Sequence, residues 1–230
     1  NSGRQTIYTT INNTNKSLIW LKCRNLNGQE HLLYSSVLPL NYWLLTNSTN
    51  EMTNSYNLFE SYNDWTTTGF TFDSSQTAIN KSGNTYVAWN FRAAPGFMDI
   101  VTWDGDSVQT GRQIPHQLQT KPGVMILKKT SGADSWFVYH QSLGATYELR
   151  LNETNGAYES SASFYDTEPT STHFTVSADP GVNGTGEEYV AYLFADTPEL
   201  IKCGSYVAPS FGTPLEVKTG LLICRHAWSD

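Results

Sequence analysis

The chain has 230 residues, a formal net charge of −7, and only 14 Lys and Arg residues, which are scattered along it. Because nucleic-acid binding depends on clustered basic side chains, we expect no nucleic-acid partner. No run of 18 apolar residues occurs, so we expect no membrane insertion. Aromatic residues make up 13% of the chain and charged residues 15%, a composition that favours β-strands over helices.

The predicted elements of the first part of the chain are short strands separated by polar turns. In chain order they cover residues 17–24, 31–34, 42–46, 69–72 and 85–92, and a further strand covers 98–103. The stretches between them carry Asn, Ser, Gly and Pro, which suit turns. No window of about a dozen residues has helical periodicity, so we expect almost no helix.

The strands of the first part recur in the second part. "LIWLK" (18–22) matches "VMILK" (124–128), "LLYSSVL" (32–38) matches "FVYHQSL" (137–143), and "FTF" (70–72) matches "FTV" (174–176). "TYVAWNF" (85–91) returns as "EYVAYLF" (188–194), and "GRQ" occurs at 3–5 and 111–113. A repeat of this kind predicts that each copy folds as one equivalent unit, and it therefore gives the domain prediction.

The word at 85–91 and 188–194 is apolar on both faces. Since side chains alternate along a strand, this pattern predicts a central strand covered on both sides in each unit. Asn90 replaces Leu193 in the first copy. We therefore expect that position to be less buried or to have a hydrogen-bond partner.

A third copy begins near the end of the chain. "LIKCGSY" (200–206) matches "FMDIVTW" (97–103), and "GLLICR" (220–225) matches "GVMILK" (123–128). We predict an all-β fold of two tandem antiparallel β-sandwich-like modules related by an internal repeat, at 1–95 and 96–199. Residues 200–230 are expected to supply strands that close onto these modules, since open edges would expose apolar strands. Alternatively, they start a module whose remainder lies elsewhere.

Residues with catalytic or metal-binding potential are few. The chain has neither a phosphate-binding glycine loop nor a His-Glu-x-x-His motif, and Cys23, Cys203 and Cys224 lack metal-type spacing. We expect reduced, packed cysteines and no cofactor. Asp104 and Asp106 resemble a fragment of a calcium loop but lack its downstream Glu, so a solvated turn is favoured over a metal site.

Aromatic residues within polar segments are the candidate ligand-binding residues. They are Tyr62, Trp65, Tyr158 and Tyr165. Rings flanked by Asn, Asp and Ser can stack on sugars while their neighbours bind hydroxyl groups. The plainer role of such rings is packing a loop onto a core or a subunit contact.

Several blocks of the chain resemble a known family. They are "SLIWLKCRN", "WTTTGFTF", "SGNTYVAWNFRAAPGFMDIVTWDGD", "IPHQLQTKPGVMILKKT" and "EEYVAYLF". In this order they resemble a repeated β domain of bacteriophage structural proteins, common in marine and cyanobacterial phages and often part of tail-fibre-like polypeptides. The resemblance covers nearly the whole chain, and it carries over no catalytic residue.

The resemblance implies a non-enzymatic structural subunit of a phage particle or appendage, such as a tail fibre, located on the virion and extracellular when released. Its expected partners are further copies of itself, as a trimer by family expectation, other virion proteins, and a host surface glycan or receptor. One alternative is a glycan- or receptor-binding module. The other, a cell-surface polysaccharide hydrolase, is disfavoured because the adjacent Glu187 and Glu188 point to opposite faces.

Overall fold

The structure is a computed structural model that describes residues 4–54, 64–72, 78–210 and 214–219. Its regular elements are almost all strands. Those of the first module are β1 (Gln5–Tyr8), β2 (Ser17–Cys23), β3 (His31–Ser35), β4 (Trp43–Leu45), β5 (Trp65–Thr66), β6 (Gly69–Phe72) and β7 (Tyr86–Arg92).

The second module contains eight strands and two four-residue helices within the described residues. They are β8 (Met98–Asp104), β9 (Arg112–Pro115), β10 (Pro122–Lys129), β11 (Phe137–His140), β12 (Tyr147–Arg150), β13 (Tyr158–Glu159), α1 (Ser161–Phe164), β14 (His173–Val176), α2 (Pro180–Asn183) and β15 (Glu188–Ala195). The predicted all-β fold of repeated sandwich-like modules with almost no helix is confirmed.

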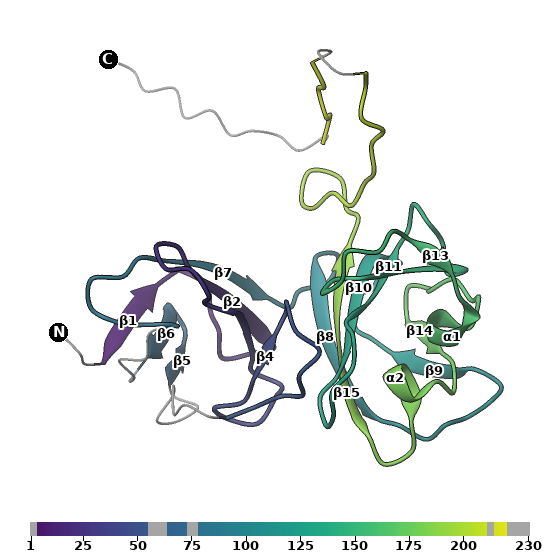
Figure 1. The fold of residues 1–230 in the computed structure, drawn as a ribbon, viewed down its shortest axis with the longest axis horizontal. Coiled ribbons are helices and arrows are strands. Elements are labelled where there is room, and N and C mark those ends of the chain that lie inside the picture. Colours follow the sequence, from purple (N-terminus) through teal and green to yellow (C-terminus); the bar gives the residue numbers. More distant parts are fainter. Residues whose placement is uncertain (1–3, 55–63, 73–77, 211–213, 220–230) are drawn as a thin grey trace.

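Each module is a large sheet packed on a small one (Figure 1). In the first module the sheet β4-β3-β2-β7 faces β1-β6-β5, and in the second β13-β12-β11-β10-β15-β8 faces β14-β9. All these pairings are antiparallel. The first core contains Ile19, Leu21 and Phe70, and the second contains Met125, Leu127 and Phe174.

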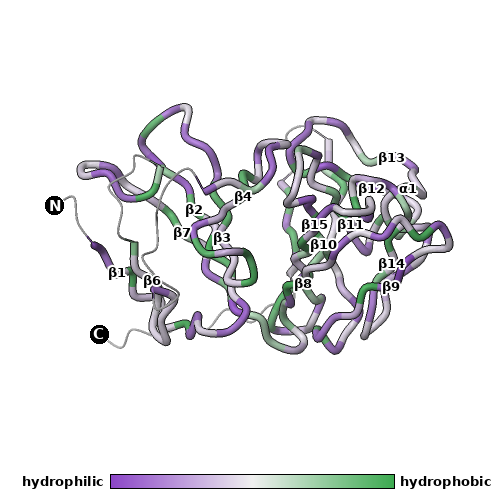
Figure 2. Tube along the Cα trace, turned by 90° about the horizontal axis from the view of Figure 1, so that it is seen from below, coloured by the Kyte–Doolittle hydropathy of each residue, from purple (hydrophilic) through white to green (hydrophobic). Residues whose placement is uncertain are grey.

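A third core joins the two large sheets. It includes Leu18 and Leu33 from the first module and Val190 and Tyr192 from the second, all buried. The hydrophobic stretches of β2, β3, β10 and β15 lie where the two modules meet (Figure 2). The chain is therefore a stack of four β layers with three apolar interfaces.

The two modules face each other through equivalent surfaces. Phe91 of β7 and Phe194 of β15 occupy the same position in the repeated word, and their rings meet edge to face with centroids 6.0 Å apart. Equivalent residues meet only when two copies are related by an approximate two-fold rotation. The repeat is therefore a pseudo-dimer within one chain.

The prediction of a covered central strand holds for β15 and is wrong for β7. β15 lies between β10 and β8, and five consecutive residues from Tyr189 to Leu193 are buried. β7 is the edge of its sheet, and Trp89 is 46% exposed. The two copies of the word differ in apolar character only at Asn90 and Leu193, but among the described residues only β15 has a neighbouring strand on its second side.

The expectation that Asn90 is less buried than Leu193 or has a hydrogen-bond partner is confirmed. The Asn90 side chain is half-buried, and its Nδ2 donates to Thr9 Oγ1 at 2.9 Å. The recurrence of "GRQ", however, is one residue out of structural register. Ile7 pairs opposite Phe70 as Ile114 pairs opposite Phe174, so Gln5 is equivalent to Arg112 rather than to Gln113.

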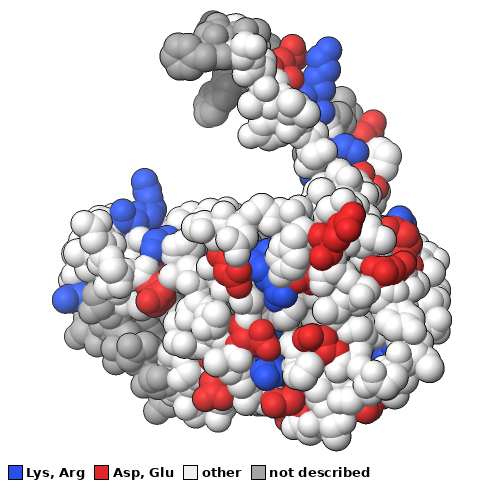
Figure 3. Space-filling view, turned by 45° about the vertical axis from the view of Figure 1, so that its right-hand side comes forward, with Lys and Arg blue, Asp and Glu red and all other residues white. Residues whose placement is uncertain are grey.

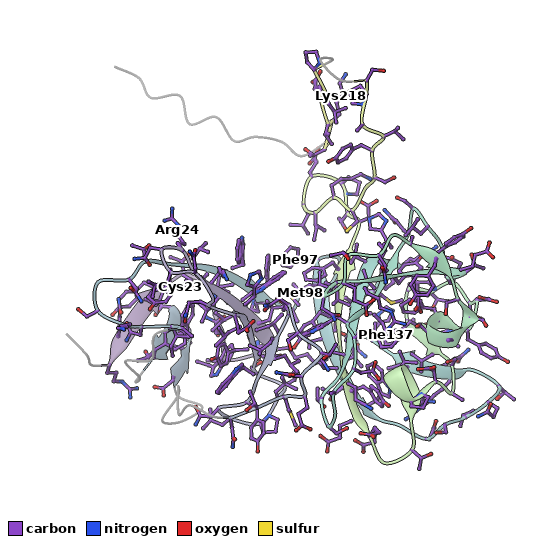
Figure 4. The ribbon with its side chains drawn as sticks, in the orientation of Figure 1. Cys23, Arg24, Phe97, Met98, Phe137 and Lys218 are labelled. Carbon is purple, nitrogen blue, oxygen red and sulfur yellow. The ribbon has the colours of Figure 1, made fainter. Side chains whose placement is uncertain are left out.

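Strand β8 begins the second module directly after β7 ends the first. It follows β7 after a turn in which Ala94 and Met98 exchange backbone hydrogen bonds of 3.0 and 3.2 Å. It then pairs along its whole length with β15 of the second module. Phe97 and Met98 lie where the modules meet (Figure 4).

Beyond Cys203 the chain leaves the second module as an extended arm (Figure 1). Residues 204–210 and 214–219 are exposed and contain no strand. Lys218 lies near the tip of the arm (Figure 4). Residues 211–213 and 220–230 of the segment 200–230 lie outside the described residues, so the expected closure of this segment onto the modules stays a prediction.

Candidate functional site

The junction between the modules contains hydrogen bonds from one module to the other and an apolar cavity. Residues 45–53 are the last residue of β4 and the segment that follows it, and we call them the clamp loop. The buried Trp136 donates its indole N–H to Leu45 O at 3.0 Å and Ser48 O at 3.1 Å. The backbone N–H of Met52 donates to Thr130 O at 3.0 Å, so the first module is fixed to the second by directed bonds.

Lys128 is buried beneath the clamp loop. Its ammonium group donates to three carbonyl oxygens, Thr49 at 3.2 Å, Lys129 at 2.8 Å and Gly132 at 3.5 Å. Burial lowers the pKa of Lys128 to about 8, and the nearby carboxylate of Asp134 only partly opposes this effect. The positive charge of Lys128 is therefore stabilised by the dipoles of these carbonyl groups rather than by a hydrogen-bonded carboxylate.

An apolar cavity of about 400 Å³ lies between the two large sheets. We call it the inter-sheet cavity. Its walls include equivalent residues from both modules, as the approximate two-fold requires. They are Trp20 with Ile126, His31 with Trp136, Thr46 with Leu151, Trp89 with Tyr192, and Phe91 with Phe194.

The lining of the inter-sheet cavity is mostly apolar, and Lys22, His31 and Thr46 are its polar residues. The ammonium group of Lys22, which lines the cavity, donates a hydrogen bond to Gln29 O. Burial, followed by the charge of Lys22, lowers the pKa of His31, which favours its neutral form. The cavity can accept an apolar group.

The first-module aromatic candidates do not form a ligand site in the described chain. Trp65 is only 6% exposed and packs in the first core. The β5–β6 hairpin sets Trp65 opposite the buried Phe70 and turns the ring inward, so the ring has the plainer of its two expected roles, packing onto a core. Tyr62 lies outside the described residues.

The second-module candidates are half-exposed and lie on either side of α1. Tyr158 is 39% exposed, and its hydroxyl group donates to the buried Glu148 while accepting from Arg150 Nε at 2.8 Å. Tyr165 is 40% exposed and ends α1 with a φ of 54°.

Tyr165 also borders a surface hollow of about 520 Å³. Its polar lining includes Gln109, Ser161, Asp166 and Asp179. Tyr158 is not part of that lining. Of the three predicted rings that the structure describes, Tyr165 is therefore the one beside a polar hollow.

The Asp104 and Asp106 pair belongs to a structural turn. The Asp106 carboxylate accepts from Asn183 Nδ2 at 2.9 Å and from Val108 N at 3.1 Å, and it pairs with Arg112 Nε at 3.2 Å. Partial burial acts to raise the pKa of Asp106, but these bonds and the Arg112 charge outweigh it and lower the pKa. The Asp104 carbonyl accepts from Arg112 Nη1, so the turn already holds a cation.

No metal centre is formed by the part of the chain that the structure describes, since no group of three or more His, Cys, Asp or Glu residues could hold an ion there. Cys23 and Cys203 are free and buried, as predicted. No helix within the described residues is long and apolar enough to cross a membrane. The visible charges are scattered over a mostly uncharged surface (Figure 3).

The clamp loop and Lys128 were not predicted as a site. A signal was present, because Lys22 and Lys128 end the two matching words "LIWLK" and "VMILK". Both ammonium groups bind backbone carbonyl oxygens. What the sequence did not show is that only Lys128 lies beneath a loop from the other module.

This geometry defines an all-β protein in which two repeated sandwich modules share a core. The chain belongs to the family described as "Domain of unknown function (DUF7483)", whose match covers residues 1–220. That match spans both modules and all of the described arm. No curated protein and no solved structure matches the chain.

Proposed function

We propose that this protein is a non-enzymatic structural subunit of a bacteriophage particle or appendage, such as a tail fibre or a related surface protein. One structural observation carries the proposal: the large sheets of the two modules pack against each other through one apolar core. Two modules joined in this way form a rigid unit that can be repeated. The sequence blocks that resemble phage structural domains support the same role.

The proposed partners are other copies of the chain and other virion proteins. Low charge and many aromatic residues make its surface inexpensive to desolvate in such contacts. The proposed location is the virion surface, where contact with the host occurs.

Mass spectrometry of purified particles from the source culture tests this role. Trypsin cleavage after Arg92 and Arg112 gives the peptide 93–112, which spans β8. We expect this peptide to copurify with infectious particles through a density gradient, and antibodies against the protein to label an appendage. Recovery of the peptide only from the particle-free fraction would contradict the proposal.

A second candidate function is binding of a host glycan at the hollow beside Tyr165. An aromatic ring next to Gln109, Asp166 and Asp179 combines a stacking face with hydrogen-bonding groups. On a glycan panel, Tyr165→Ala should lose binding that the unaltered protein shows. A matched control is Tyr158→Ala, which lies outside this hollow; equal loss by both variants would contradict the assignment.

A further inference from the structure

The free side of β7 is an open strand edge. Among the described residues β7 is bonded to one strand, β2, whereas the equivalent β15 is bonded to β10 and β8. The consequence is visible at one position of the repeat: Tyr192 is 1% exposed and its counterpart Trp89 is 46% exposed. Open edges of this kind are sites where a further strand adds.

Strand β8 shows what fits such an edge. It pairs antiparallel with β15, with Val101 opposite Ala191 and Thr102 opposite Val190. The positions of β7 equivalent to Ala191 and Val190 are Ala88 and Val87. The repeat therefore gives both the direction and the register of the strand that would complete β7.

The arm carries the matching segment. Its base repeats the turn that precedes β8: Thr197 and Ile201 exchange backbone hydrogen bonds of 3.0 Å, as Ala94 and Met98 do. The residues that correspond to Val101 and Thr102 are Gly204 and Ser205.

These arm residues have no strand partner within the described chain, and apolar side chains follow them. Tyr206 is 66% exposed and Val207 is 90% exposed. An apolar segment of a few residues in extended form is suited to strand addition, where backbone bonds give affinity.

The arm is directed away from its own β7. Gln141 Nε2 donates to Cys203 O at 2.7 Å, and Lys202 pairs with Asp196 Oδ2 at 2.9 Å, which fixes the base of the arm to the second module. From there the arm projects outward from the body (Figures 1 and 3). It is thus placed to meet another molecule.

We propose that the arm segment Gly204–Val207 of one copy adds as an antiparallel strand to β7 of a second copy, with Gly204 opposite Ala88 and Ser205 opposite Val87. Such a contact joins different surfaces of the two copies and produces chains or closed rings. The inference deepens the proposed structural role. Its test uses the purified protein alone, so its failure and the failure of the particle experiment are separate results.

Disulfide trapping tests the register. Two preparations, one carrying Ala88→Cys and the other Gly204→Cys, are mixed under mild oxidation; both have Cys23, Cys203 and Cys224 replaced by Ala. Directly opposed residues of an antiparallel pair are close enough for a disulfide. We expect a disulfide-linked heterodimer, which can form only between two copies.

The matched control replaces Gly204→Cys by Ser205→Cys, whose side chain points to the opposite face. Its yield should fall at least about tenfold. Equal yields from both mixtures, or no cross-link, would overturn the proposal. The double variant A88C/G204C distinguishes closure within one chain: an internal disulfide at high dilution, with none between mixed copies, would also overturn it.

Self-association gives a second, independent measurement on the full chain. Ser205→Pro removes a backbone donor in an exposed segment that pairs with no described strand of its own copy, so both modules should still fold. Sedimentation velocity should show association of the unaltered protein weakened at least about tenfold by Ser205→Pro and retained by Ser205→Thr. A wild-type protein that stays monomeric at every concentration would refute the inference.

Discussion

At the scale of single residues, the buried Lys128 is the most unusual group of the protein. Its ammonium group is held by three backbone carbonyl oxygens, one of them in the clamp loop of the other module. A charge buried in this way reduces the free energy of unfolding, because the unfolded chain solvates it fully. The free energy of unfolding should increase again when Lys128 loses its proton.

Stability should therefore rise with pH above 8. The pKa of Lys128 is about 8 in the folded chain against 10.5 as its ordinary value, so between these values the unfolded state binds more protons. Relative to Lys128→Met, the free energy of unfolding of the wild type should increase by about 2 kcal/mol from pH 7.5 to 9.5. Urea unfolding at several pH values measures this, and a pH-independent difference between the two proteins would contradict it.

At the scale of elements, the close approach of β1 to β6 depends on Gly69. In the β1–β6 pair, Tyr8 lies opposite Gly69. A Cβ added at Gly69 would come within 2.0 Å of the Ile7 carbonyl oxygen. The absence of a side chain at this position allows β1 to approach, and so lets Ile7 pack against the first core.

Gly69→Ala should separate β1 from β6. Overpacking of this kind costs about 1 to 3 kcal/mol of folding free energy, measured by chemical denaturation. Gly156→Ala is the matched control, since nothing lies within 4 Å of an added Cβ there and its effect should stay within about 0.5 kcal/mol. Equal effects of the two substitutions would show that β1 does not depend on this approach.

At the scale of the whole molecule, the two modules share one core and form one pseudo-symmetric body. The fully buried Trp136 takes part in both the apolar and the hydrogen-bonded contacts between them. Its ring packs in the third core with residues of the first module, and its indole N–H donates to Leu45 O of the clamp loop. Both modules should therefore unfold together.

Trp136→Ala should uncouple them. Truncation of a buried Trp costs about 3 to 5 kcal/mol, and here the loss includes bonds between the modules. We expect the single calorimetric transition of the wild type to divide into two. Trp89→Ala, which truncates a half-exposed ring of the same sheet interface, should lower the melting temperature less and keep one transition. Two transitions in the wild type would contradict shared folding.

The sequence alone determined the strands, the repeat and the all-β class. Alternating apolar residues and turn-forming residues are local signals, so strands such as β2, β6 and β8 were located to within about a residue. The same reasoning placed the Asn90 side chain correctly, since an amide replacing Leu193 needs a partner or exposure. The expectation that Asp106 sits in a turn rests on equally local chemistry.

The tertiary structure alone decided what each strand lies beside. The words at 85–91 and 188–194 carry the same pattern, yet one is an edge and the other is central, because pairing depends on distant segments. The same holds for Trp65, whose ring was turned inward by a hairpin, and for Lys128, which was buried by a loop of the other module. The sequence specifies which surfaces are apolar, and only the folded arrangement determines which of them are covered.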